Sequence, residues 1–142
     1  MTSSPAFIIR AGLYLLIIVS GLALRGFGFS FGLSAFVVKY GGSLLWAAMV
    51  FFLVAMAASH ASRQSVALIS AAIAVGVELF RLVHAPWLDA FRLTLPGALL
   101  LGRIFSLWNM LAYGVGIALA VGLDRMAIDA LAARLRPHAG AR

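Results

Sequence analysis

The sequence predicts an all-α integral membrane protein in which four helices form a bundle, and three observations lead to this fold class. Hydrophobic residues make up 64% of the 142 residues and charged residues only 11%, whereas soluble domains carry about 45–50% apolar and about 25% charged residues. Four apolar segments approach the roughly 20 residues that a helix needs to cross a bilayer core about 30 Å thick. The length fits one domain.

The predicted spans are residues 6–24, 42–59, 65–83 and 105–123. The first contains Arg10, close enough to its start for the side chain to reach the interface. Its basic flank also resembles that of a cleaved signal peptide, but its apolar stretch is long for one. We therefore favour a retained helix.

The segments between and after these spans predict interfacial structure. Residues 25–41 are rich in glycine and phenylalanine and too broken to span, with a short helix expected at residues 34–40. Residues 84–102 contain Pro86 and Pro96 and predict an interfacial or re-entrant piece. Residues 124–142 form a separate tail, which begins as a basic amphipathic helix suited to an anionic leaflet; a solvated tail helix is the alternative.

The distribution of basic residues predicts an orientation and a class of partner. The net charge of +7 favours anionic lipids or a phosphorylated ligand, and the scattered basic residues argue against nucleic acid. Four spans place both termini on one side, with six basic residues there against five on the other. The positive-inside rule then predicts cytoplasmic termini.

The end of the bundle opposite the termini collects unusual residues, including all three tryptophans. One interpretation is a basic, aromatic-rimmed pocket between the helices. The other is an ordinary membrane interface, where tryptophans gather and long loops are polar. The candidate ligand-binding residues are Arg25, Lys39, Trp46, Glu78, Arg81, His84, Trp87, Asp89, Arg92, Arg103, Trp108 and Asn109.

Glu78 and Arg81 interrupt the third span and are costly there. An ionised residue within a span costs about 2.5–3.5 kcal/mol on insertion scales, so such residues usually face the interior and are paired. At positions i and i+3 the two side chains can meet. A structural ion pair is favoured, and a functional acid is the alternative.

Two stripes of small residues predict close helix packing. They are Ala112, Gly116 and Ala120 in the fourth span, and Ala72 and Gly76 in the third. Small residues let helix backbones approach in lipid. We expect both stripes to pack inside the bundle, with dimerisation as the alternative.

The sequence contains no nucleotide-binding, metalloprotease or serine-hydrolase motif. It has no cysteine, and its three histidines are too dispersed for one metal site, so we expect neither a metal nor a cofactor. His84, Asp89 and Glu78 could form an acid–base set, although their spacing does not require it. A non-enzymatic role is favoured.

Several motifs resemble a known family. KYGGSLLWAAMVFF, ELFRLVHAPWLDAFRLTLPGALLLG and FSLWNMLAYGVG resemble the small bacterial inner-membrane proteins of domain of unknown function 2809, some labelled YjgA-type, and more distantly VanZ-like membrane proteins. The resemblance implies a multi-pass protein of the bacterial inner membrane. It also implies acids where this chain has Ser43 and Asn109, and glutamine in place of Arg81. These departures favour a binding or structural role.

The preferred function is therefore binding of an anionic amphiphile, such as a phospholipid or polyprenyl phosphate, with membrane lipids as partners. In this prediction Arg25, Lys39, Arg92 and Arg103 contact the phosphate, and the tryptophans pack against the chain or sugar. One alternative is an accessory subunit of a larger membrane complex or a homo-oligomer. Another is a small transporter or membrane enzyme that uses Glu78 and His84.

Overall fold

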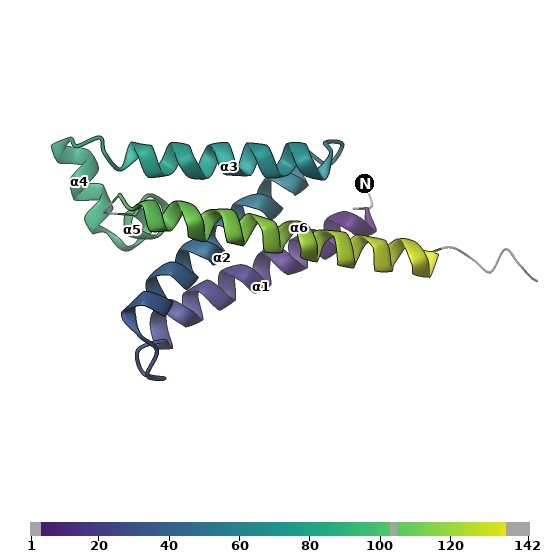
Figure 1. Cartoon of the computed structure of the whole chain (residues 1–142), viewed down its shortest axis with the longest axis horizontal. Helices are drawn as coiled ribbons and strands as arrows, with labels where there is room; N and C mark the ends of the chain where they lie inside the picture. The colour runs from purple at the N-terminus through teal and green to yellow at the C-terminus, as the bar shows by residue number, and fades with distance from the viewer. Residues whose placement is uncertain (1–3, 103–104, 136–142) are drawn as a thin grey trace, which may run out of the picture.

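The computed structural model describes residues 4–102 and 105–135, and four long helices dominate it (Figure 1). They are α1 (Pro5–Phe27), α2 (Ala35–Ala57), α3 (Arg63–Phe80) and α6 (Leu107–Leu135). All four are long and apolar enough to cross a membrane. The chain is thus an all-helical membrane protein with four spans, as the composition predicts.

Three of these helices begin at a serine that caps the first turn. The hydroxyls of Ser4, Ser34 and Ser62 accept hydrogen bonds from backbone N–H groups three residues ahead. Each bond satisfies a donor that the helix itself leaves unpaired. Proline follows Ser4 at the first helical position, where its missing N–H costs nothing.

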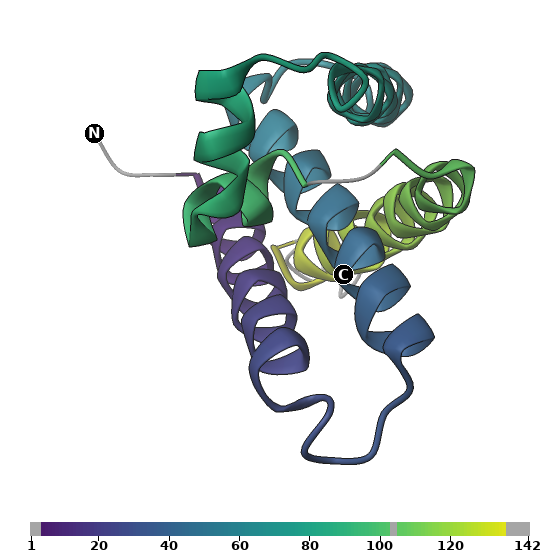
Figure 2. The ribbon, with the colours of Figure 1, turned by 90° about the vertical axis from the view of Figure 1, so that its left-hand side faces the viewer.

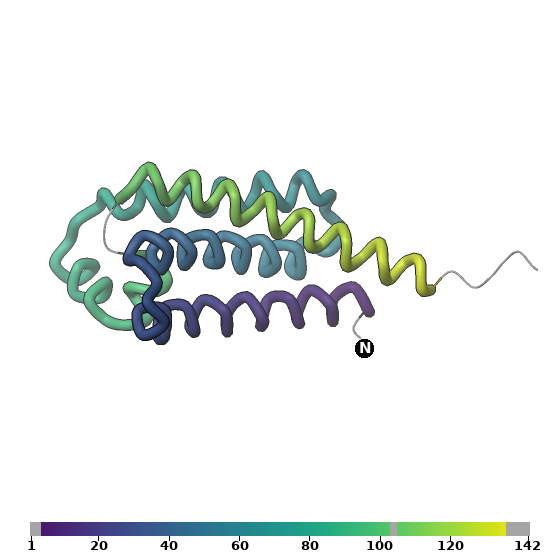
Figure 3. Tube along the Cα trace, turned by 60° about the horizontal axis from the view of Figure 1, so that its bottom comes forward, coloured from purple at the N-terminus to yellow at the C-terminus, as the bar shows by residue number. Residues whose placement is uncertain are grey.

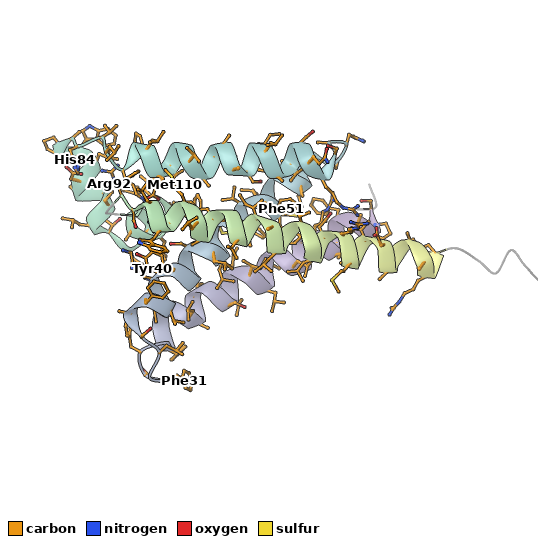
Figure 4. The ribbon with its side chains drawn as sticks, viewed as in Figure 1. Phe31, Tyr40, Phe51, His84, Arg92 and Met110 are labelled. Carbon is orange, nitrogen blue, oxygen red and sulfur yellow. The ribbon has the colours of Figure 1, made fainter. Side chains whose placement is uncertain are left out.

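Helix α2 is the central element and packs against α1, α3 and α6. Its small residues and two phenylalanines form the best-buried part of the core: Ala47, Phe51 and Phe52 have no exposed surface. Phe51 lies midway along the bundle in Figure 4. Many large hydrophobic side chains are exposed on the four long helices, which suits helices surrounded by lipid.

The second span begins seven residues earlier than predicted, at Ala35 rather than residue 42. The short helix expected at residues 34–40 is the first part of α2, so the loop before it is shorter than residues 25–41. The helix continues through the glycine pair at residues 41 and 42. A Cβ atom at Gly41 would lie 2.9 Å from Leu24 Cδ2, so the glycine leaves room for this side chain of α1. The glycine lets α1 and α2 approach closely.

Two short helices, α4 (Pro86–Leu93) and α5 (Leu95–Leu100), occupy the segment predicted to be interfacial or re-entrant. They lie over the end of the bundle opposite the N-terminus (Figure 2). Pro86 and the dipeptide Leu95–Pro96 lie in their first turns, where proline is tolerated. Thr94 ends α4 and caps α5 by accepting a hydrogen bond from the Gly97 N–H.

The tail is helical to Leu135, but it does not form a separate element: α6 runs through it without a break. Its 29 residues span about 43 Å at 1.5 Å per residue, well beyond the roughly 30 Å bilayer core. Figure 3 shows α6 continuing past the ends of α2 and α3. Residues 136–142 of the predicted tail lie outside the described residues.

The two small-residue stripes behave differently. On α6, Gly116 and Ala120 are buried inside the bundle, which confirms the expected internal packing. On α3, Ala72 and Gly76 are exposed, and a Cβ at Gly76 would meet no atom within 4 Å. The prediction that the α3 stripe packs inside is therefore wrong. The face of α3 that is buried against the bundle contains Ser70, Ala74 and Glu78 instead.

Candidate functional site

An apolar groove lies between the first halves of α2 and α6. These two helices run in the same direction (Figure 1). The volume of the groove is about 300 Å³, at the lower end of the range for ligand sites. The lining is almost wholly hydrocarbon. The residues that line this α2–α6 groove are Phe36, Val37, Tyr40, Gly41 and Leu44 on α2, and Trp108, Leu111, Ala112 and Val115 on α6.

A basic side chain stands at the α2 wall of the groove. The Lys39 ammonium lies 5.0 Å from the centroid of the Tyr40 ring, and Tyr40 also contacts Phe36, with ring centroids 4.6 Å apart. Figure 4 shows Tyr40 on α2 beside the start of α6. Across the groove, Trp108 is 60% exposed. The groove therefore joins an apolar wall to one cation and an aromatic rim.

Two contacts join α2 and α6 at residues that line the groove or are next to lining residues in the sequence. At Gly116 the backbones meet so closely that a Cβ would collide with the Leu44 carbonyl oxygen. Nearer the start of α6, the Ser43 hydroxyl lies 3.2 Å from the Asn109 side-chain oxygen and 3.2 Å from the Lys39 carbonyl oxygen. The structure thus brings together Ser43 and Asn109, two of the three positions at which the resemblance implies a different residue.

Glu78 is fully buried and is the centre of a polar cluster. Its carboxylate accepts hydrogen bonds from Arg81 Nη1 at 2.5 Å and from the Tyr113 hydroxyl at 2.8 Å. It also accepts bonds from the Ser106 backbone N–H at 2.6 Å and from Asn109 Nδ2 at 3.2 Å. We call these five residues the Glu78 cluster. The predicted contact of Glu78 with Arg81 is confirmed.

The position of the Glu78 cluster explains why an acid is kept inside the bundle. Ser106 immediately precedes α6, so the carboxylate lies at the helix N-terminus, where the helix dipole favours negative charge. Arg81 also donates from Nε to the Leu101 carbonyl at 2.6 Å, and its guanidinium packs over Gly102, whose φ is +67°. Glu78 and Arg81 therefore fix the ends of α3, α5 and α6 together.

Arg92 is also buried, and its guanidinium is hydrogen bonded to other groups of the protein. Its guanidinium donates to the carbonyls of Phe80 (2.6 Å) and Val83 (2.8 Å), just where α3 ends. Its other partner is Asp89, at 3.2 Å, which also lies 3.3 Å from His84 Nδ1. His84 and Asp89 are on the surface of this end, and Figure 4 shows His84 beside α4. Arg92 thus joins α4 to the last carbonyl of α3 and to the turn that follows it.

A second buried carboxylate, Asp124, lies at the opposite end of the bundle, and the sequence interpretation missed it. It binds Arg10 Nε at 2.7 Å and Arg63 Nε at 3.0 Å. Arg10 also donates to the Ala55 carbonyl, and Arg63 contacts Asp129. A signal was present: the topology places Arg10, Arg63 and Asp124 at the same end of three spans, where buried charges must pair.

The structure divides the candidate residues into separate environments. Glu78, Arg81 and Asn109 form one cluster, and His84, Asp89 and Arg92 another; His84 is not among the described partners of Glu78. Trp46 is turned inward, with its ring 5.4 Å from Tyr113, whereas Trp87 and Trp108 are exposed. Arg25 is exposed on α1, and Arg103 lies outside the described residues. Lys39 and Trp108 remain beside the groove.

In a comparison with protein-family models, residues 32–117 match the family described as Protein of unknown function (DUF2809). The matched region contains α2 to α5 and the start of α6, and with them the groove and the Glu78 cluster. The likeness to VanZ-like proteins is not shown. No solved structure matches the chain.

Proposed function

The chain belongs to this DUF2809 family, and from its site we propose that it is a non-enzymatic membrane protein that binds an anionic phospholipid in the α2–α6 groove. One acyl chain lies against Tyr40, Leu44, Trp108 and Val115. The phosphate lies near Lys39. The observation that carries this proposal is the joining of a hydrocarbon groove to a cation at its rim.

The contacts of the other basic candidates support a phosphate site with fewer residues than the sequence predicts. Arg81 and Arg92 have partners within the protein, and a phosphate at either would have to replace buried hydrogen bonds. Arg25 belongs to α1, which does not line the groove. We therefore assign the phosphate contact to Lys39 alone among the described basic residues, with Trp108 packing against the chain.

A quenching experiment tests this proposal. Trp46→Phe and Trp87→Phe leave Trp108 as the only tryptophan, and the protein is placed in vesicles of phosphatidylcholine and phosphatidylglycerol. Brominated chains on one lipid or the other quench Trp108 when that lipid occupies the groove. We expect phosphatidylglycerol to be preferred about fivefold, because a lysine near an anionic lipid contributes about 1 kcal/mol.

Lys39→Ala should abolish the preference, and Arg25→Ala provides the matched control at the same end of the bundle. The control should leave the preference unchanged. Equal quenching by the two lipids in the parent protein, or equal loss in both variants, would show that the groove does not select anionic lipid.

We further propose that the protein lies in the bacterial inner membrane with its termini in the cytoplasm. The chain has no cysteine, so single cysteines report the side of each connection. A cysteine at His60, in the turn between α2 and α3, should be shielded from a membrane-impermeant thiol reagent in intact cells. A cysteine at Ser30, between α1 and α2, should be labelled. The reverse pattern would invert the orientation.

A further inference from the structure

We infer that the α2–α6 groove takes its anionic phospholipid from the membrane leaflet opposite the termini, which is the extracytoplasmic leaflet in the proposed orientation. This inference rests on the proposed function and specifies which pool of phospholipid the groove binds. Two features support it: the position of the groove and of Lys39 along the bundle, and the closed interface between α2 and α6 beyond the groove.

The groove occupies only the first part of α6, at the end of the bundle opposite the N-terminus (Figure 1). Its α6 wall runs from Trp108 to Val115, or about 10 Å at 1.5 Å per residue. Asp124 lies about 14 Å farther along the same helix. Its partner Arg63 is 36% exposed and also contacts the exposed Asp129, so these charges mark the polar boundary on the side of the termini. Because half of a bilayer core measures about 15 Å, the groove lies in the half away from the termini.

The cation of the groove lies at the same end. Lys39 is in the second turn of α2, and its side chain is exposed. Ala55, whose carbonyl binds Arg10, lies about 24 Å farther along α2. A lipid of the termini-side leaflet has its phosphate near the level of Arg10, so this phosphate would have to cross most of the apolar core to reach Lys39. Charges are costly there, and a lipid of the opposite leaflet meets Lys39 without that cost.

Beyond the groove, the interface between α2 and α6 is closed. Gly116 follows the last lining residue of α6, and a Cβ atom there would collide with the Leu44 carbonyl oxygen, so the two backbones are in contact. Farther toward the termini, the core residues Ala47, Phe51 and Ala120 have no exposed surface. An acyl chain from the termini-side leaflet therefore meets packed core residues instead of a continuation of the groove.

The groove is accessible from within the opposite leaflet. Four of its lining side chains are between 51% and 62% exposed, namely Phe36, Trp108, Leu111 and Val115. A phospholipid of that leaflet therefore reaches the groove by lateral diffusion, with its headgroup at the membrane surface throughout.

Vesicles with different lipids in their two leaflets test the inference. The protein with Trp108 as its only tryptophan carries a soluble domain fused to its N-terminus, so that insertion into preformed vesicles leaves the termini outside. Lipid exchange confines brominated phosphatidylglycerol or brominated phosphatidylcholine to one leaflet. In the inner leaflet, opposite the termini, we expect phosphatidylglycerol to be preferred about fivefold as judged by the quenching of Trp108. In the outer leaflet, we expect little quenching by either lipid and no preference.

Two variants serve as controls. Lys39→Ala should bring the inner-leaflet ratio close to one. Leu79→Trp combined with Trp108→Phe places the only tryptophan on α3, at a site that is 49% exposed, at the same end of the bundle and outside the groove. This tryptophan should be quenched from the inner leaflet by both lipids equally.

The outcomes separate the inference from the proposed function. A preference for phosphatidylglycerol that arises from the termini-side leaflet, or equally from both leaflets, overturns the inference and leaves the proposed lipid binding intact. The absence of any preference when both leaflets contain the brominated lipids overturns the proposed function and the inference together.

Discussion

Replacing Glu78 with alanine is expected to lower the free energy of unfolding by about 3–5 kcal/mol, the usual cost of removing one member of a buried ion pair. Ser106, just before α6, and Asn109 and Tyr113 in its first turns lose their shared acceptor. Arg81 keeps its charge without the carboxylate. The measurement is reversible unfolding in mixed micelles of a mild detergent and SDS, followed by helical circular dichroism.

Matched variants separate the effect of the Glu78 charge on stability from the effect of its size. Glu78→Gln keeps the size and an acceptor oxygen, so its loss should be smaller than that of the alanine variant. Asp89→Asn changes a carboxylate that is 45% exposed at the same end and should cost less than Glu78→Ala, because the buried Arg92 guanidinium keeps its bonds to the Phe80 and Val83 carbonyls. If Glu78→Ala unfolded at the same SDS fraction as the parent, the cluster would not hold α3 and α6 together.

Replacing Asp124 with alanine is the other change with a large expected effect. Two arginines would be left facing each other near the end of the bundle, where Arg10 is only 16% exposed. We expect a loss of about 3 kcal/mol, at the lower end of the range for broken buried pairs because Arg63 can turn toward the interface. The same unfolding measurement gives the value.

Replacing Asp124 is also expected to loosen one helix, α1, more than the others. Arg10 joins α1 both to Asp124 and to the Ala55 carbonyl on α2, so α1 should separate from α6 first. Limited proteolysis in micelles should then cut α1 earlier than in the parent protein. Asp129→Ala is the control, since Asp129 is 60% exposed and should change neither measurement. Cleavage of α1 at the parent rate would contradict the assigned role of Asp124.

The two buried carboxylates show why the polar residues were only partly predictable. Glu78 and Arg81 are three residues apart on one helix, so their contact follows from helical geometry alone. Arg10 and Asp124 are 114 residues apart, and nothing in their local sequence favours one partner over another. Likewise, the sequence predicted that Trp46 and Trp108 lie at the same end of the bundle. That Trp46 points inward and Trp108 outward depends on how each helix is rotated.

The groove illustrates the same limit. Lys39 and Trp108 stood among twelve candidate residues, whereas Tyr40, Leu44 and Gly116 were not linked to a site. The groove lies between two helices, and its lining depends on how each helix is rotated and how far apart their backbones lie. The stripe on α6 predicted a close contact, and the comparable stripe on α3 faces outward, because small residues permit packing without specifying a partner.

The sequence by itself determined that this is a four-span helical membrane protein, because lipid acts as the solvent on each apolar segment separately and requires its backbone to be hydrogen bonded within a helix. Only the tertiary structure decided the partners of Glu78, Asp124 and Arg92, the outward face of α3, and the groove beside Lys39. Those features depend on the rotation and spacing of neighbouring helices. Lipid solvates every apolar helix face equally well, so the hydrophobic pattern does not set the rotation or the spacing of the helices. Contacts of small residues and pairing of buried charges set them.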